Sequence, residues 1–238
     1  MPFDNPIYCA VDKTDPEEAA ALVRAVQGPV GGIKIGKEFF TANGPQGVRG
    51  LAASGLPLFL DLKFHDIPNT VAGAVRAVCA LNPAMINVHA LGGTAMMRAA
   101  AAAAAAVEAG GADRPLVLGV TVLTSLDDDD LADVGIGGRL TDEVVRLATL
   151  AQNAGLDGVV CAPQEIAAPR RACGPVFSLV VPGIRPAAAD AGDQKRTMTP
   201  LEARALGANV LVIGRAITAA PEPAGAARAL AAELAAAA

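Results

Sequence analysis

The chain has 238 residues, of which 53% are hydrophobic and 18% are charged, so it has ample material for a core and is not a disordered chain. Its formal net charge is −5 and its pI is about 5.0, which excludes a surface that binds duplex nucleic acid in bulk. The mean hydropathy is +0.41, yet no apolar stretch reaches the roughly 18 residues of a membrane span, so we expect no membrane association.

The start of the chain and its cysteines are typical of a cytoplasmic protein. Residues 1–12 have no basic start followed by an apolar segment, so we expect no signal peptide. The four cysteines form no Cys-x-x-Cys pair, and we expect them to be reduced and mostly buried. The histidines are His65 and His89, and neither they nor the cysteines have the spacing of zinc ligands.

Eight short apolar runs that are rich in β-branched residues recur along the chain. They are continuous rather than alternating, which is typical of parallel strands that helices cover. The predicted strands are residues 7–12, 30–36, 57–64, 84–90, 116–123, 157–162, 176–183 and 209–214.

Helical segments are predicted between these strands. Three of them have start and stop signals, at 14–18 and Gly28, at Thr141 and Gly155, and at the capping box 199–202 and Gly207. The alanine run 99–106 is interpreted as one side of an outer helix. The acidic run 127–130 favours a solvated loop or helix start over a metal site.

The alternation of strand and helix, eight times in about 250 residues, predicts an α/β fold with a single (β/α)8 TIM barrel over residues 1–238. A doubly wound open sheet is the alternative, and the count of eight favours the barrel. No Pro- or Gly-rich linker divides the chain.

The third predicted strand, 57–64, carries the most informative polar residues. Its alternation places Asp61 and Lys63 on the face opposite its three leucines, so both charged side chains point into the mouth of the barrel. Buried charges need partners, and Lys34 and Asp66 are available to alternate with them. A plain salt-bridge network at the barrel rim is the alternative.

The last two predicted strands end in glycine–arginine pairs, in PGIRP at 182–186 and IGRA at 213–216. Loops at this place commonly bind phosphate in barrels, and Arg215 is suited to bidentate binding of an anion. A surface turn is the alternative for each pair. The polar segment 186–198 is interpreted as a mobile lid or, alternatively, as a merely disordered loop.

These motifs resemble the orotidine 5′-phosphate decarboxylase family. The D-x-K-x-x-D-I-x-x-T pattern at 61–70 is the most specific of them. The others follow in the family's order and span essentially the whole chain, at 10–12, 33–36, 87–90, 122–125, 182–186 and 213–217.

The resemblance implies a catalytic array of two lysines and two aspartates. Lys63 matches the lysine that delivers a proton to C6 of the pyrimidine, and Asp61, Asp66 and Lys34 complete the alternation. In the family, the residue matching Asp66 reaches the site from the other subunit, with those matching Ile67 and Thr70 beside it. The resemblance therefore implies a homodimer with shared active sites.

Further roles follow from the same resemblance. Orotidine 5′-phosphate is the implied substrate, with no metal and no cofactor, and the histidines are assigned structural roles. The implied binding residues are Asp12 and Lys34 for the ribose, Thr124 near the base, Gln194 in the lid, and Arg185, Gly214 and Arg215 for the phosphate.

Two other functions remain open at this point. Barrels such as 3-keto-L-gulonate 6-phosphate decarboxylase or hexulose-6-phosphate synthase use Mg²⁺, but need an acidic ligand from the second strand. This chain has Lys34 in that region, and Glu38 lies beyond it. A non-catalytic barrel that senses a nucleotide would need no proton donor, and a lysine between two acids is costly to bury for binding alone.

Overall fold

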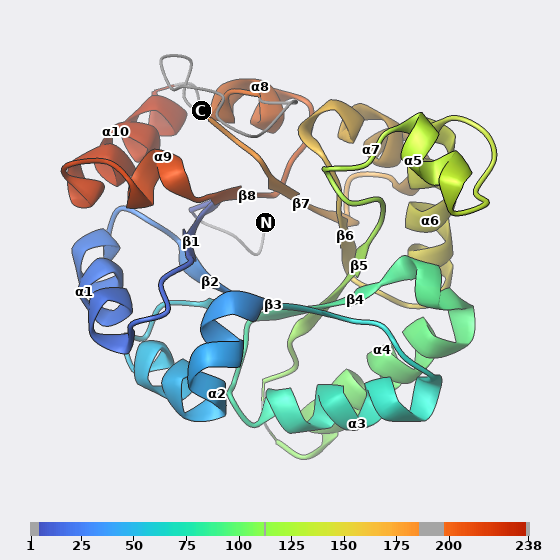
Figure 1. Cartoon of the computed structure of the whole chain (residues 1–238), viewed down its shortest axis with the longest axis horizontal. Coiled ribbons are helices and arrows are strands. Elements are labelled where there is room, and N and C mark those ends of the chain that lie inside the picture. The colour runs from blue at the N-terminus through green and yellow to red at the C-terminus, as the bar shows by residue number, and fades with distance from the viewer. Residues whose placement is uncertain (1–4, 112, 186–197, 237–238) are drawn as a thin grey trace.

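The computed structural model describes residues 5–111, 113–185 and 198–236. Eight strands close into a barrel, and helices surround it on the outside (Figure 1). Each strand is parallel to the next, and β8 pairs with β1. The predicted TIM barrel is therefore confirmed, and the open sheet is excluded because the strand order closes on itself.

Every strand lies inside the run that the sequence predicts for it, with slightly tighter bounds. The strands are β1 (Ile7–Val11), β2 (Gly32–Gly36), β3 (Leu58–Phe64), β4 (Met85–His89), β5 (Leu116–Val120), β6 (Gly158–Val160), β7 (Ser178–Pro182) and β8 (Val210–Ile213).

Helices connect the strands and form the outer layer. The α-helices are α1 (Pro16–Val26), α2 (Lys37–Ala52), α3 (Pro68–Cys79), α4 (Gly93–Ala109), α5 (Asp128–Asp133), α6 (Leu140–Asn153), α7 (Ala167–Cys173), α8 (Pro200–Ala205), α9 (Arg215–Thr218) and α10 (Pro223–Ala235). Two short 3-10 helices, Ala90–Gly92 and Pro163–Glu165, follow β4 and β6.

The predicted helix starts hold to within one residue. The Asp15 carboxylate accepts hydrogen bonds from the backbone N–H groups in the first turn of α1. At the start of α8, Thr199 forms the predicted capping box with Glu202. Helix α6 begins at Leu140 rather than at Thr141. The acidic run begins α5, where Asp127 caps the helix.

The alanine run lies in α4, as predicted. By length and composition, Ala90–Ala109 passes as a candidate membrane span. Its Met96, Met97 and Ala100 are nevertheless buried in the core between the barrel and the helices. Small side chains let the helix pack closely, so this segment is part of the helical layer around the barrel.

The apolar side chains form two cores. The larger core lies between the strands and the helices and includes Leu58 and Leu60. The smaller core fills the barrel interior with Tyr8, Ala10, Phe59, Met85, Leu118, Val180, Val210 and Val212. Three of the four free cysteines are buried and Cys79 is half-buried. Because the interior is filled below them, polar side chains gather at the carboxyl ends of the strands.

Candidate active site

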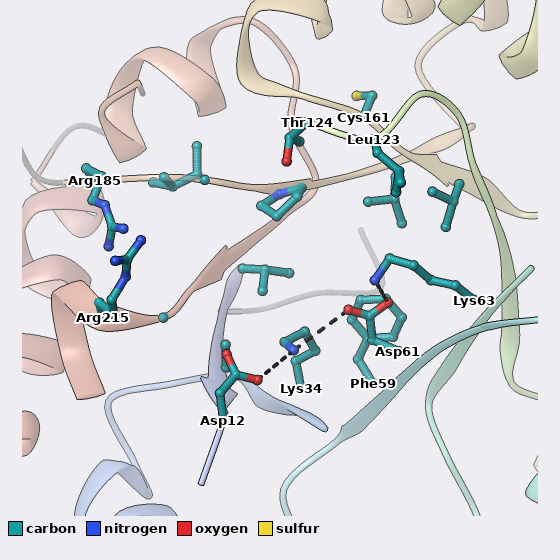
Figure 2. Close-up of a pocket in the computed structure, with 18 of the residues that line it drawn as sticks. Asp12, Lys34, Phe59, Asp61, Lys63, Leu123, Thr124, Cys161, Arg185 and Arg215 are labelled. Carbon is teal, nitrogen blue, oxygen red and sulfur yellow. Dashed lines mark hydrogen bonds and ion pairs between the residues drawn. The ribbon is translucent and has the colours of Figure 1, made fainter. Parts of the chain in front are cut away.

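A cavity of about 530 Å³ opens at the carboxyl ends of the strands (Figure 2). Its size is that of a pocket for a small organic ligand. Residues from β1, β2, β3, β5, β6, β7 and β8 and their loops line it. The polar and charged lining residues are Asp12, Lys34, Asp61, Lys63, Thr124, Arg185, Arg215 and Thr218.

Strand β3 presents Phe59, Asp61 and Lys63 to this cavity, as its alternation predicts. The alternation is not regular to its end, however. The pairing of β3 with β4 shifts between Leu60 and Phe64, and Lys63 has a φ of 55°. This left-handed conformation is rare outside glycine and costs about 1–3 kcal/mol. Surrounding contacts must therefore hold the Lys63 backbone in place.

Four charged side chains form a continuous chain along one wall of the cavity (Figure 2). Lys34 Nζ lies 3.1 Å from Asp12 Oδ1 and 3.7 Å from Asp61 Oδ2. Lys63 Nζ lies 2.5 Å from Asp61 Oδ1. The alternation places each ammonium beside a carboxylate, and the Lys34 and Asp61 side chains are only 11% and 13% exposed. The neighbouring carboxylates stabilise the charged form of both lysines in a site that is partly shielded from water.

Asp61 is the centre of this array. Burial alone would raise the pKa of its carboxyl. The ammonium groups of Lys63 and Lys34 and the hydrogen bonds from Lys63 and Asn87 lower the pKa, and together they outweigh the effect of burial. The pKa of Asp61 therefore lies below its usual value, and the group is an anion at neutral pH. Asn87 Nδ2 donates to Asp61 Oδ1 at 2.6 Å.

Asp66 is not brought to the array within one chain. It lies in the turn between β3 and α3, where its Oδ1 accepts the N–H of Ile67 at 2.6 Å. Asp66, Ile67 and Thr70 are all exposed, and Ile67 is 67% exposed. None of them lines the cavity. The interpretation that Asp66 neutralises Lys63 of its own chain is therefore wrong, because the chain turns away from the barrel mouth after Phe64.

The two predicted glycine–arginine pairs meet across the cavity from Lys63 (Figure 2). Arg185 follows β7 and is 7% exposed, and Arg215 begins α9 directly after β8. Burial and the charge of Arg215 both lower the pKa of Arg185. Within the described part of the chain, Arg185 Nε is buried without a hydrogen-bond partner. Two close cations with an unsatisfied donor suit an anionic group.

Apolar residues make up a third side of the cavity. Val122, Leu123 and Thr124 of the 122–125 motif lie on this side, together with Val160 and Cys161. Val160 and Cys161 belong to a run that is typical of an ordinary strand, so the sequence did not single them out as lining residues. Burial raises the pKa of the Cys161 thiol and keeps it neutral. Gln194 lies outside the described residues.

The two histidines face each other beside the array, with ring centroids 5.4 Å apart. Burial lowers the pKa of His89 to about 4, and the charges of His65, Lys63 and Lys37 act in the same direction. His89 is therefore neutral at pH 7. Among the described residues, neither ring lines the cavity.

Comparison with known proteins shows the family of the chain. Residues 5–230 match the model of the orotidine 5′-phosphate decarboxylase / HUMPS family. The chain belongs to this family. Two family members named orotidine 5′-phosphate decarboxylase, from Paramagnetospirillum magneticum and Rhodospirillum rubrum, are each 55% identical to it. Each alignment spans 97% of this chain, with 98% of the first relative and 94% of the second.

Solved structures agree with this membership. The orotidine 5′-phosphate decarboxylase of Lactobacillus acidophilus is 35% identical, with a TM-score of 0.86 over 97% of this chain and 99% of that one. An uncharacterised conserved protein of Geobacillus kaustophilus is 37% identical, with a TM-score of 0.84 over 96% and 99% of the two chains. The family resemblance that the motifs indicate is therefore confirmed.

The second strand bears on the metal-dependent alternative. The acidic ligand that such a site requires is absent from β2, where the Lys34 ammonium lies between Asp12 and Asp61. Glu38 is exposed in the first turn of α2 and does not line the cavity. The Lys34 ammonium is therefore the group that these two carboxylates contact at the end of β2.

Proposed function

We propose that the protein is a carbon–carbon lyase that decarboxylates orotidine 5′-phosphate to UMP and CO2, using neither a metal nor a cofactor. The observation that carries the proposal is the alternating chain of Lys34, Asp61 and Lys63, which faces the same cavity as Arg185 and Arg215. The names of the relatives at 55% identity support this choice of substrate.

The arginine pair is assigned to the phosphate of the substrate. Arg185 and Arg215 place two guanidinium groups together, and a phosphate dianion between them would relieve their repulsion. Gly214 lines the cavity beside Arg215, and its lack of a side chain leaves the backbone accessible. Because the phosphate is remote from the reacting carbon, its binding energy serves to orient the pyrimidine.

Two other sides of the cavity are assigned to the ribose and the base. Asp12 and Lys34 carry hydrogen-bonding atoms suited to ribose hydroxyls, and Thr124, on the apolar side, is assigned to the base. In this assignment the pyrimidine lies between the phosphate site and Lys63. Its C6 carboxylate then lies close to the array of charges.

Lys63 is assigned the chemical step. Breaking the bond between C6 and the carboxylate releases CO2 and leaves the electron pair on C6. The Lys63 ammonium stabilises that negative charge and gives its proton to C6, forming UMP, and the neutral amine then regains a proton from water. Asp61 favours the charged form of Lys63 before the reaction and orients its Nζ by the 2.5 Å contact.

We propose that Asp66 completes the array from a second copy of the chain. The exposure of Asp66, Ile67 and Thr70 supports this assignment, since a homodimer would cover them and bring them to the partner's cavity. Each active site would then hold Lys63 of one subunit and Asp66 of the other. The proposed enzyme is cytoplasmic and acts on a small molecule, without a nucleic-acid or membrane partner.

Mixed dimers test the shared site. Lys63→Ala and Asp66→Ala chains, each inactive alone, are expected to regain roughly a quarter of wild-type activity when unfolded together and refolded. Half of the dimers are then mixed, and each mixed dimer has one intact site. Lys63→Ala mixed with Asp61→Ala is the control and stays inactive, because both residues belong to one subunit. No recovery in verified mixed dimers would contradict a shared site.

The activity itself is tested with orotidine 5′-phosphate in excess EDTA, followed by the ultraviolet absorbance of the pyrimidine. Rapid conversion to UMP is expected. Conversion only after Mg²⁺ is restored would support the metal-dependent relatives instead. Tight UMP binding with no conversion under either condition would favour a nucleotide sensor.

A further inference from the structure

Asn87 bridges the two residues at the centre of the array. It lies on β4 and is 0% exposed, so its amide must find partners inside the protein. Its Nδ2 donates to Asp61 Oδ1 at 2.6 Å, and its Oδ1 accepts the backbone N–H of Lys63 at 2.7 Å. An amide is suited to this position because one end donates and the other accepts.

The pairing of β3 with β4 explains why a side chain is needed here. Leu60 lies opposite Ile86 and Phe64 lies opposite Val88, so residues 61–63 face Asn87 alone. The β3 strand bulges at this point, and the Lys63 N–H is met by the Asn87 side chain. The left-handed backbone of Lys63, with its φ of 55°, lies within this bulge.

We propose that Asn87 is a positioning residue of the reaction, one that acts through Lys63 and Asp61 without touching the substrate. One end holds the unusual Lys63 backbone that aims the Nζ at the cavity. The other end fixes the oxygen of Asp61 that also accepts from Lys63 Nζ. The role in catalysis rests on the proposed function, in which Lys63 is the proton donor.

A merely structural amide would act differently. Asn209 provides the comparison, since it is 6% exposed and its Oδ1 accepts the N–H of Leu179 at 2.8 Å and Arg170 Nη2 at 2.6 Å. It precedes β8 and does not line the cavity. Asn209→Ala is therefore a control that removes a buried amide that also accepts a backbone N–H, at a site away from the array.

Kinetics of Asn87→Ala test the proposal first. We expect kcat to fall about 100-fold while KM changes less than threefold, because the misplaced group is the proton donor. Asn209→Ala is expected to lower the melting temperature but to keep kcat within threefold of wild type. Equal losses of kcat in the two variants, or a wild-type kcat in Asn87→Ala, would overturn the proposal.

Asn87→Asp adds a readout that a structural role would not change. The introduced carboxyl is isosteric, but as an anion it repels Asp61. With one proton shared by the two carboxyl groups, it donates to Asp61 and still accepts from the Lys63 N–H. Its kcat, relative to wild type, is therefore expected to recover at least tenfold as the pH falls from 8 to 5. A ratio that is independent of pH would count against positioning.

A crystal structure of Asn87→Ala separates this proposal from the proposed function. The Lys63 φ is expected to leave the left-handed region, and the contact between Lys63 Nζ and Asp61 to lengthen. An unchanged Lys63 would overturn the positioning role whatever the activity. If the wild-type protein failed to decarboxylate the substrate, the proposed function would fail, and this structure would still decide whether Asn87 positions Lys63.

Discussion

Gly36, at the end of β2, leaves the space that the Lys34 ammonium occupies. A Cβ added at Gly36 would lie 2.9 Å from Lys34 Nζ and 3.5 Å from Asp12 Oδ1. The φ of Gly36 is −95°, which any residue adopts, so Gly36→Ala does not strain the backbone. Because the atom it meets is the end of a flexible side chain, we expect Lys34 rather than the fold to move.

The displacement has a calculable size. Ordinary contact begins near 3.4 Å, so the ammonium must withdraw by about 0.5 Å. This weakens the contacts of Lys34 with Asp12 at 3.1 Å and with Asp61 at 3.7 Å. A misplacement of about 1 Å costs about 100-fold in rate. We therefore expect Gly36→Ala to lower kcat/KM by about 10- to 100-fold, or about 1.4–2.7 kcal/mol.

The assay compares steady-state decarboxylation with thermal unfolding. Gly36→Ala is expected to keep its melting temperature within about 4 °C of wild type, which corresponds to about 1 kcal/mol. Gly50→Ala is the control, because this exposed α2 glycine has nothing within 4 Å of an added Cβ. It should keep full activity. An unchanged kcat/KM in Gly36→Ala, or a loss that only follows unfolding, would refute the reasoning.

Two further predictions concern the phosphate site and acid stability. Arg215→Ala should raise KM about 10- to 100-fold with a smaller effect on kcat, and unchanged kinetics would contradict the phosphate assignment. The pKa of His89 is about 4 when folded and 6.5 when unfolded, so unfolding takes up a proton in between. Stability from this histidine is complete above pH 6.5 and falls by about 1–2 kcal/mol toward pH 4, after discounting for partial exposure. Denaturant melts of His89→Gln should show a shallower loss over that range, and an identical slope would contradict the prediction.

The fold could be predicted from the sequence because parallel strands that are buried on both faces have continuous apolar sequences. The direction of the Asp61 and Lys63 side chains was also predictable, since the leucines between them mark the opposite face. The left-handed backbone of Lys63 was not, because a bulge depends on how β3 pairs with β4. Local pattern carries no information on that pairing.

Asn87 and Asp66 show two other limits of sequence reasoning. In the sequence, Asn87 is a single polar residue in an apolar strand. Its hydrogen-bond partners, Lys63 and Asp61, can be identified only once β3 is known to pair with β4. Asp66 lies three positions from Lys63, which suggested a contact within the chain. The turn before α3 instead leaves it exposed. In the proposed dimer Asp66 acts from a second copy, and such a role cannot be placed from spacing along one chain.

The most direct test of the account is the single-turnover rate of Lys63→Ala with orotidine 5′-phosphate in EDTA. The ammonium is assigned both the stabilisation of the C6 charge and the delivery of the proton, and each effect is worth about 100-fold or more. We predict a folded protein that binds UMP and decarboxylates its substrate at least about 10,000-fold more slowly than wild type. A rate within about tenfold of wild type would contradict the assignment of Lys63 as the proton donor.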